Sequence, residues 1–246
     1  KLYNQFDKIL TISKDDYESF TNFEVDLNKI EIAGDTRFDR VHQRSVISGT
    51  KKLLREDIFT NRKIIVAGST WHEDEEILLP VFNKIVEHHK NVILIIAPHE
   101  PTIEHIEKIE AECKKNTIRF SALNNFNNEQ IIIVDSIGIL MTLYYYSYIA
   151  FVGGSFKSNV HNVLEAAVYG VPVFYGPKIF NSQEAVTLSK IGGGKIIHNK
   201  KTFYRNISEL LRNENSQKKL GELSKKFVLE NTGATEKILN EVYKWI

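Results

Sequence analysis

The sequence predicts a doubly wound α/β fold, in which helices cover both faces of a parallel sheet. From Lys63 onward, short β-branched runs alternate with amphipathic stretches of helical period. The runs are apolar throughout, which is typical of strands that are buried on both faces. Even the longest of them, such as residues 91–97, are far shorter than the ~20 residues that a membrane-spanning helix needs.

The alternation gives the expected elements in order, and a helical C-terminus follows it. The expected strands are residues 63–68, 91–98, 117–122, 130–135, 148–154, 172–176 and 195–198. The expected helices between them are residues 73–89, 102–115, 138–147, 162–170 and 181–192, followed by 202–213, 216–231 and 233–246. Lys and Glu dominate the outer faces of the last three helices, which we interpret as solvated surfaces.

The pattern before this alternation is less complete. Residues 9–12 are expected to form a short strand before a serine-capped helix, and residues 29–34 a second strand before another helix. We predict that residues 1–36 are the tail of a preceding N-terminal domain, or a linker. Residues 37–246 are then the main domain.

The composition excludes several classes of function. The 32 basic and 31 acidic side chains nearly cancel, so no global field would attract nucleic acid or an anionic membrane surface. The single cysteine, Cys113, argues against a disulfide framework and a cysteine-rich zinc site. No signal peptide is visible, and the chain begins at Lys1 in mid-pattern. We therefore expect a cytoplasmic piece of a longer protein.

The residues that follow each expected strand are the candidate site residues. In open parallel sheets, ligands bind in the crevice outside the carboxyl ends of the strands. We therefore expect five turns to share one rim of the sheet. They contain Ser69–Thr70, His99–Glu100, Asp135–Gly138, Gly153–Ser155 and Gly176–Glu184.

The pair Gly153–Gly154 lies between a strand and a helix start, in a loop with Ser155 and His161. Glycine allows positive φ or a close approach of the backbone to a ligand, and the free amides of a helix start can bind a phosphate. The spacing matches neither the dinucleotide fingerprint nor the Walker loop. A tight structural turn with a polar cap fits the same pattern equally well.

Three polar residues near these turns could contact a ligand. Asn162 and Glu165 are three residues apart, so on a helix they share a face and could hydrogen-bond a ribose diol or a base edge. A surface polar pair at a helix start has the same pattern. His99 could donate to a phosphate, or it could be an ordinary loop histidine. The histidines are not spaced like metal ligands, so we predict no metal site. A nucleophilic triad has no support either, because the sequence lacks a G-x-S-x-G motif.

Taken in chain order, six stretches resemble the C-terminal part of the 3-deoxy-D-manno-octulosonic acid (Kdo) transferases, glycosyltransferases of the GT-B architecture. Together they cover most of residues 30–190, and the HN-x-LE-x-A core with a following GP and E is their most specific part. The stretches are GDTRFDRV at 34–41, AGSTWHEDEE at 67–76, IAPHE at 96–100, VDSIGIL at 134–140, FVGGSFKSNVHNVLEAAVYGVPV at 151–173 and YGPKIFNSQEA at 175–185.

The resemblance implies a Rossmann-like, donor-binding domain that is one half of a GT-B fold. It also implies transfer of Kdo from CMP-Kdo to the lipid A precursor in lipopolysaccharide biosynthesis, without a cofactor, at the cytoplasmic face of the inner membrane. Asn162 and Glu165 match positions that hold CMP. The substrate-binding set that we expect is completed by Arg37, Ser69, Thr70, His99, Ser136, Ile137, Gly138, Gly153, Gly154, Ser155, His161 and Glu184.

On this reading the catalytic base, the acceptor site and the membrane contact lie in an N-terminal domain outside this chain. We therefore expect no catalytic residue here and no activity of the fragment alone. Two alternatives remain open: another GT-B nucleotide-sugar enzyme, such as a UDP-sugar transferase or epimerase, and a non-catalytic nucleotide-binding α/β domain.

Overall fold

A computed structural model describes residues 2–114, 116–244 and 246 of the chain. The chain folds into two compact units. The larger unit runs from Ser45 to Phe227, and the smaller one joins the chain up to Arg44 with the chain from Val228 onward. A domain boundary after residue 36 stays a prediction.

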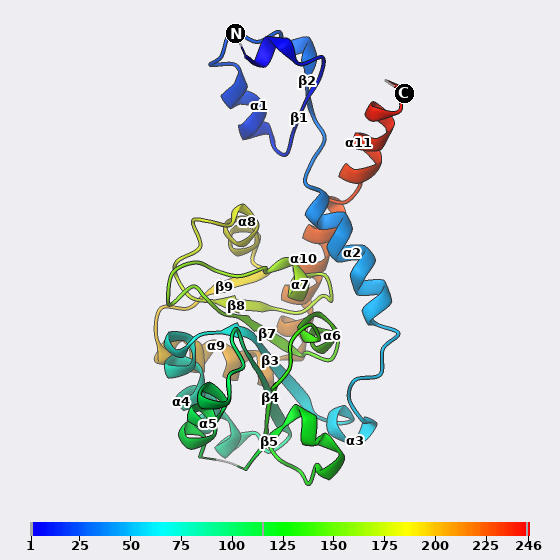
Figure 1. Cartoon of the computed structure of the whole chain (residues 1–246). Helices are drawn as coiled ribbons and strands as arrows, with labels where there is room; N and C mark the ends of the chain where they lie inside the picture. Colours follow the sequence, from blue (N-terminus) through cyan, green and yellow to red (C-terminus); the bar gives the residue numbers. More distant parts are fainter. Residues whose placement is uncertain (1, 115, 245) are drawn as a thin grey trace. The chain divides into compact units, whose positions relative to one another are not determined.

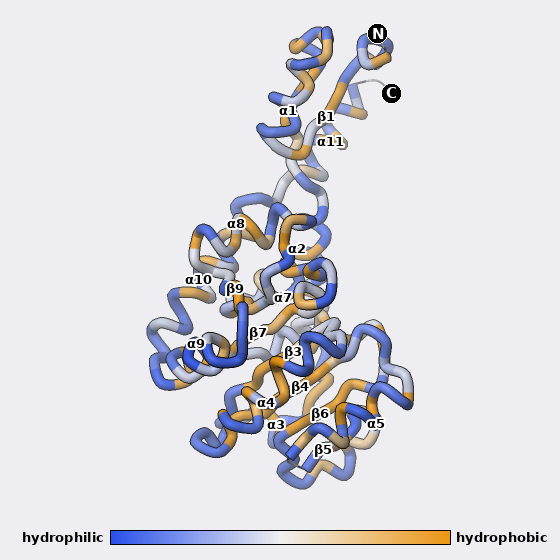
Figure 2. Tube along the Cα trace, turned by 90° about the vertical axis from the view of Figure 1, so that its left-hand side faces the viewer, coloured by the Kyte–Doolittle hydropathy of each residue, from blue (hydrophilic) through white to orange (hydrophobic). Residues whose placement is uncertain are grey.

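The larger unit is built on a sheet of seven parallel strands, which confirms the predicted fold class (Figure 1). The strands are β3 (Lys63–Thr70), β4 (Val92–Pro98), β5 (Thr117–Arg119), β6 (Ile131–Ile133), β7 (Ile149–Val152), β8 (Val173–Tyr175) and β9 (Gly194–Ile196). Their order across the sheet is β5-β6-β4-β3-β7-β8-β9. Strand residues are almost all buried, and Figure 2 shows β4 and β6 as hydrophobic segments.

Helices cover both faces of this sheet. The helices of the unit are α3 (Glu56–Phe59), α4 (His72–His88), α5 (Ile103–Glu112), α6 (Leu140–Tyr144), α7 (Leu164–Ala167), α8 (Gln183–Ile191), α9 (Lys200–Arg212) and most of α10 (Glu214–Glu230), with a 3-10 helix at Phe120–Asn125. One face packs alternate strand residues, such as Ala67 and Phe151, against apolar side chains of α4, α5 and α9. On the other face, Tyr175 donates to the Ala185 carbonyl of α8, and Ser224 of α10 donates to the Gly193 carbonyl.

Several expected elements are shorter in the structure than in the prediction, and contacts in the structure account for some of the differences. The strand expected over 117–122 ends at Arg119, because the Ser121 amide and hydroxyl both donate to Asp135 and draw the chain into a 3-10 turn. The helix expected over 138–147 covers only Leu140–Tyr144. The helix expected over 162–170 covers only Leu164–Ala167. Its late start follows from the Asn162 side chain, which accepts from the Leu164 amide in a turn that precedes the helix.

The described part of the smaller unit contains two short parallel strands, three helices and the end of α10. The strands β1 (Ile9–Thr11) and β2 (Ile30–Ile32) pair with each other. Helix α1 (Lys14–Phe20) starts with the predicted serine cap, in which Ser13 and Asp16 form a capping box. The other elements are α2 (Thr36–Ser48), which runs on into the larger unit, α11 (Ala234–Val242) and 3-10 turns at Tyr3–Gln5 and Leu27–Lys29. In the described part of the chain, no helix has the length and apolarity needed to cross a bilayer.

Candidate functional site

The strand order reverses at the boundary between β3 and β7, and such switch points are where open α/β sheets bind ligands. The backbone turns after these two strands touch each other. The Gly153 amide donates to the Gly68 carbonyl at 2.9 Å. A Cβ on Gly153 would lie 2.3 Å from the Ser69 carbonyl oxygen, so only glycine fits at this crossing.

The turn after β4 joins the same crossing. The His99 amide donates to the Thr70 carbonyl at 2.9 Å, just past a bulge at which Ser69 adopts a φ of 52°. A positive φ is uncommon for a residue other than glycine and occurs often at ligand sites. The turns after β3, β4 and β7 therefore share one rim, as predicted.

Four side chains form a stacked cluster on this rim. The His99 ring stacks on the His161 ring with centroids 4.4 Å apart, and it also lies 4.8 Å from the Trp71 ring. The Trp71 indole donates to His161 Nε2 at 3.1 Å, and the Lys157 ammonium lies 3.2 Å from the centre of the Trp71 ring. Burial and the neighbouring His99 lower the pKa of His161, which suits its role as an acceptor. Lys157 is exposed and brings a positive charge to the rim.

The buried carboxylate of Asp74 binds backbone amides of the glycine turn on the side that faces the protein interior. Its side chain is fully buried and accepts from the Gly154 amide at 2.8 Å, the Trp71 amide at 2.9 Å and the Phe156 amide at 3.4 Å. Burial raises the pKa of Asp74, although these hydrogen bonds act in the opposite direction. The Gly154 amide is thus already used and is not open to a phosphate. With a helix of only four residues after the turn, an anion here would have to rely on side chains.

Sequence reasoning missed Asp74, Trp71 and Lys157. Asp74 is the third residue of α4 and stands three positions after Trp71, which is the position of the second member of a capping box. The residue at the first position is Trp71 and not Ser or Thr, so the motif is hidden in the sequence. The contacts of Lys157 and Trp71 join distant parts of the chain, and no local pattern marks them.

The turn after β8 is linked to the glycine turn through Ser155. This buried hydroxyl accepts from the Gly176 amide at 2.6 Å. Further along the same loop, Ser182 donates to the carboxylate of Glu184 at 2.7 Å, and Glu184 is buried at the start of α8. Ser155 therefore fixes the turn, while Glu184 lies inside the fold.

Asn162 and Glu165 lie next to each other beyond the glycine turn. The Asn162 amide donates to the Glu165 carboxylate at 3.3 Å, while its carbonyl oxygen accepts from the Leu164 amide. Asn162 is exposed and Glu165 half-buried. The pair is accessible to a ligand, and its own hydrogen bond pre-orients it.

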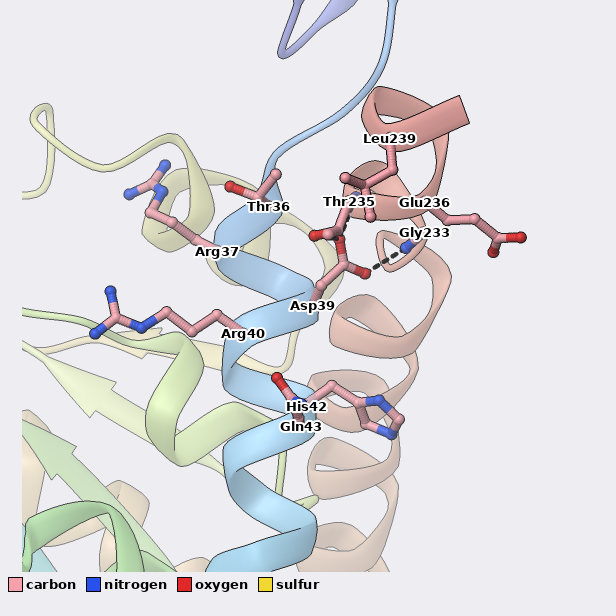
Figure 3. Close-up of a pocket in the computed structure, with 10 residues that line it drawn as sticks. All are labelled: Thr36, Arg37, Asp39, Arg40, His42, Gln43, Gly233, Thr235, Glu236 and Leu239. Carbon is pink, nitrogen blue, oxygen red and sulfur yellow. Dashed lines mark hydrogen bonds between the residues drawn. The ribbon is translucent and has the colours of Figure 1, made fainter. Parts of the chain in front are cut away.

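Two groups of predicted residues are not among the residues of this cluster. Ser136, Ile137 and Gly138 form an exposed turn after β6, in which Ile137 is 82% exposed. Arg37 belongs to the smaller unit, where its guanidinium pairs with Asp35. Figure 3 shows Arg37 and Arg40 pointing away from α11, while Asp39 holds the Gly233 and Thr235 amides at the start of that helix.

The described residues contain no group of three or more His, Cys, Asp or Glu that could together ligate a metal ion. The rim instead offers the exposed cations Lys157 and Lys178, imidazole rings, hydroxyls and an amide–carboxylate pair. Such groups can bind a mononucleotide, in which one phosphate carries the charge and a ribose and base present polar edges.

Comparison with known proteins identifies relatives along the whole chain. No family model matches the sequence. A 3-deoxy-D-manno-octulosonic acid transferase of Rickettsia prowazekii is 30% identical over 98% of this chain and 52% of its own length. One of Haemophilus influenzae is 30% identical over 86% of this chain and 51% of its own length. The chain thus spans about half the length of the curated relatives that it matches.

Solved structures share the fold. The C-terminal CMP-Kdo binding domain of WaaA from Acinetobacter baumannii has a TM-score of 0.63 and 23% identity, covering 79% of this chain and 96% of that domain. A UDP-GlcNAc 2-epimerase from Neisseria meningitidis bound to UDP-GlcNAc has a TM-score of 0.67 and 13% identity, covering 97% of this chain and 61% of that protein. At these identities the likeness establishes the architecture, which is that of one half of a GT-B protein.

Proposed function

Since this chain is a homologue of the Kdo transferases and spans about half of their length, we propose that it is the donor-binding half of such an enzyme. The reaction would transfer Kdo from CMP-Kdo to the lipid A precursor during lipopolysaccharide biosynthesis. The observation that carries the proposal is the rim at the β3–β7 switch point, where accessible polar side chains gather beside the glycine crossing.

On this proposal the rim binds the CMP part of the donor through side chains. The exposed ammonium of Lys157 and the imidazole of His99 would face the phosphate, together with the Ser69 hydroxyl. Asn162 and Glu165 would hold the ribose or the cytosine edge, because a carboxylate accepts hydroxyl protons and an amide both donates and accepts.

CMP is the leaving group of this reaction, so negative charge grows on a single phosphate as the bond to the sugar breaks. A fixed cation and hydroxyl donors can stabilise that charge in the transition state. Asp74 keeps a carboxylate just behind the turn, so the groups in front of it must supply the positive potential. We further propose that the base, the acceptor site and the membrane contact lie in the part of the enzyme outside this chain, and that the chain alone is inactive.

Isothermal titration calorimetry with CMP and UDP tests the proposal. We expect the wild-type chain to bind CMP in preference to UDP, and Asn162→Ala and Glu165→Ala each to weaken CMP binding by roughly 1 to 3 kcal/mol. Glu222→Ala removes an exposed carboxylate of α10 and should leave the affinity unchanged. Unchanged CMP affinity in both site variants, with melting points like that of the wild type, would refute the assignment.

A UDP-sugar enzyme is the second candidate, because the TM-score with the UDP-GlcNAc 2-epimerase is as high as that with the CMP-Kdo binding domain. A ligand that binds only the folded protein raises its melting temperature. A larger thermal shift with UDP than with CMP would therefore favour this candidate. Binding of a nucleotide without any transfer by the full-length protein would instead indicate a non-catalytic binding domain.

A further inference from the structure

A buried acid–histidine pair lies behind the rim, and the proposed function does not use it. Glu75 of α4 has a side chain that is only 2% exposed, and its Oε1 accepts from the Thr70 hydroxyl at 2.7 Å. Its Oε2 lies 2.8 Å from Nε2 of His105 in α5. The other ring nitrogen of His105, Nδ1, lies 3.0 Å from the carbonyl oxygen of Glu100.

The hydrogen-bonding capacity of these atoms fixes how many protons they share. A carbonyl oxygen can only accept, so Nδ1 of His105 must carry a proton. The short contact between Nε2 and Glu75 then needs one further proton between those two atoms. His105 is thereby held from both sides, by a carboxylate of α4 and by the backbone of the turn after β4.

The contacts form a closed ring around that turn. The His99 amide donates to the Thr70 carbonyl, the Thr70 hydroxyl donates to Glu75, and His105 connects Glu75 to the Glu100 carbonyl. His99 therefore lies in a short segment that is tied at both ends to the same buried carboxylate.

Other charged side chains near the ring are paired among themselves. His72 and Glu76 of α4 lie 3.2 Å apart, and Lys108 of α5 contacts His72 at 3.1 Å. Asp74, which precedes Glu75, is engaged with the glycine turn. For His105, Nε2 contacts the Glu75 carboxylate and Nδ1 contacts the Glu100 carbonyl.

We infer that Glu75 and His105 are positioning residues, which lock the turn that carries His99 against the rim and so set the affinity of the site for its ligand. This inference rests on the proposed function for its ligand, but the locking itself is a property of the ligand-free chain. Both residues act through His99 and are not among the proposed nucleotide contacts.

Hydrogen exchange of single amides in the ligand-free chain tests the locking. We expect His105→Ala and Glu75→Ala to speed exchange of the His99 amide by about tenfold or more, because the turn loses its anchor. The Leu94 amide, which donates to the Gln130 carbonyl inside the sheet, should exchange as in the wild type.

Conservative variants separate locking from a general role in stability. Gln at position 75 can accept from Thr70 and donate to Nε2 of His105, so Glu75→Gln should retain the protection of His99. His105→Gln can reach Glu75 but not the Glu100 carbonyl, so it should lose that protection. Glu104→Gln, an exposed change in the same helix, is the matched control and should behave as the wild type.

CMP titration of the same variants tests the consequence for the site. We expect about a tenfold loss of affinity in His105→Gln and full retention in the Glu104→Gln control. Unchanged His99 exchange in His105→Gln, or exchange that rises equally at Leu94, would overturn the inference. If the wild type bound no CMP, the proposed function would fail, while the exchange data would still decide whether the pair locks the turn.

Discussion

Replacing Asp74 with alanine should destabilise the larger unit more than any other single polar change at the rim. Asp74 is fully buried and is the acceptor for three backbone amides, those of Trp71, Gly154 and Phe156. Alanine would leave all three amides without their acceptor. It would also disconnect the start of α4 from the glycine turn after β7.

The contacts allow the size of this effect to be worked out. A buried amide left without an acceptor costs about 1 to 3 kcal/mol. The hydrogen bond from the Gly154 amide is buried. The hydrogen bonds from the Trp71 and Phe156 amides are only partly buried, so water can replace part of what they lose. We expect Asp74→Ala to lower the free energy of unfolding by about 3 to 4 kcal/mol, and the melting temperature by roughly 10 °C.

Asp74→Asn gives a matched comparison. One amide oxygen can still accept from Trp71 and Gly154, and only the weak 3.4 Å contact to Phe156 becomes a clash of donors. Because Asn also avoids burying a charge, we expect a loss of only about 1 kcal/mol. Urea unfolding followed by circular dichroism measures both variants. A loss below about 1 kcal/mol in Asp74→Ala would refute the reasoning, since that is less than one unsatisfied buried amide costs.

The pH dependence of this comparison follows from the sign of the shift. Burial raises the pKa of Asp74 above its ordinary 3.8, so the folded protein holds this proton more tightly than the unfolded chain. The stability that this proton contributes is complete below the unfolded pKa and is lost as the pH rises through the folded pKa. The advantage of the wild type over Asp74→Asn should therefore be largest below pH 3.8 and should decline as the pH rises from there through the folded pKa.

Three further outcomes are expected. Gly153→Ala should lower the free energy of unfolding by at least about 3 kcal/mol in thermal unfolding, because the new Cβ would collide with a backbone oxygen. Gly138→Ala should lower it by about 1 kcal/mol, because Gly138 has a φ of 85° but open space around it. Burial raises the pKa of the Cys113 thiol to about 12, so iodoacetamide at pH 8 should alkylate it far more slowly in the folded chain than in urea. Lys157→Ala should change the fluorescence of Trp71 and weaken CMP binding by about 1 kcal/mol or more; unchanged values of both would contradict its placement at the phosphate.

The sheet was predictable because each strand carries its own signal. Every expected strand from Lys63 onward is present, since a run such as residues 92–98 is short, apolar on both faces and rich in β-branched residues, which favours a buried parallel strand. The short elements were less predictable. The helix before Gly170 starts only at Leu164, because the Asn162 side chain accepts from the Leu164 amide and holds the preceding residues in a turn.

The candidate site was predictable in place but not in chemistry. The rule that ligands bind beyond the carboxyl ends of strands brought together Thr70, His99 and Gly153, which the structure joins by backbone contacts. The rule does not predict which acceptor each backbone amide of these turns has in the fold. Gly154 has the sequence context of a phosphate-binding turn, yet its amide is held by a carboxylate that lies 80 residues earlier in the chain.

That substitution of an internal carboxylate for an external anion changes how the rim can work. A turn whose amides point at a phosphate gains positive potential from the backbone. In this turn, the Gly154 amide donates to the internal carboxylate of Asp74, so its positive potential is not available to a ligand. A ligand at this rim would then be held by side chains, and their positions depend on packing between turns. This is why the stack of Trp71, His99 and His161 and the buried Glu75–His105 pair matter: they give the turns at the rim the rigidity that preorganised binding requires.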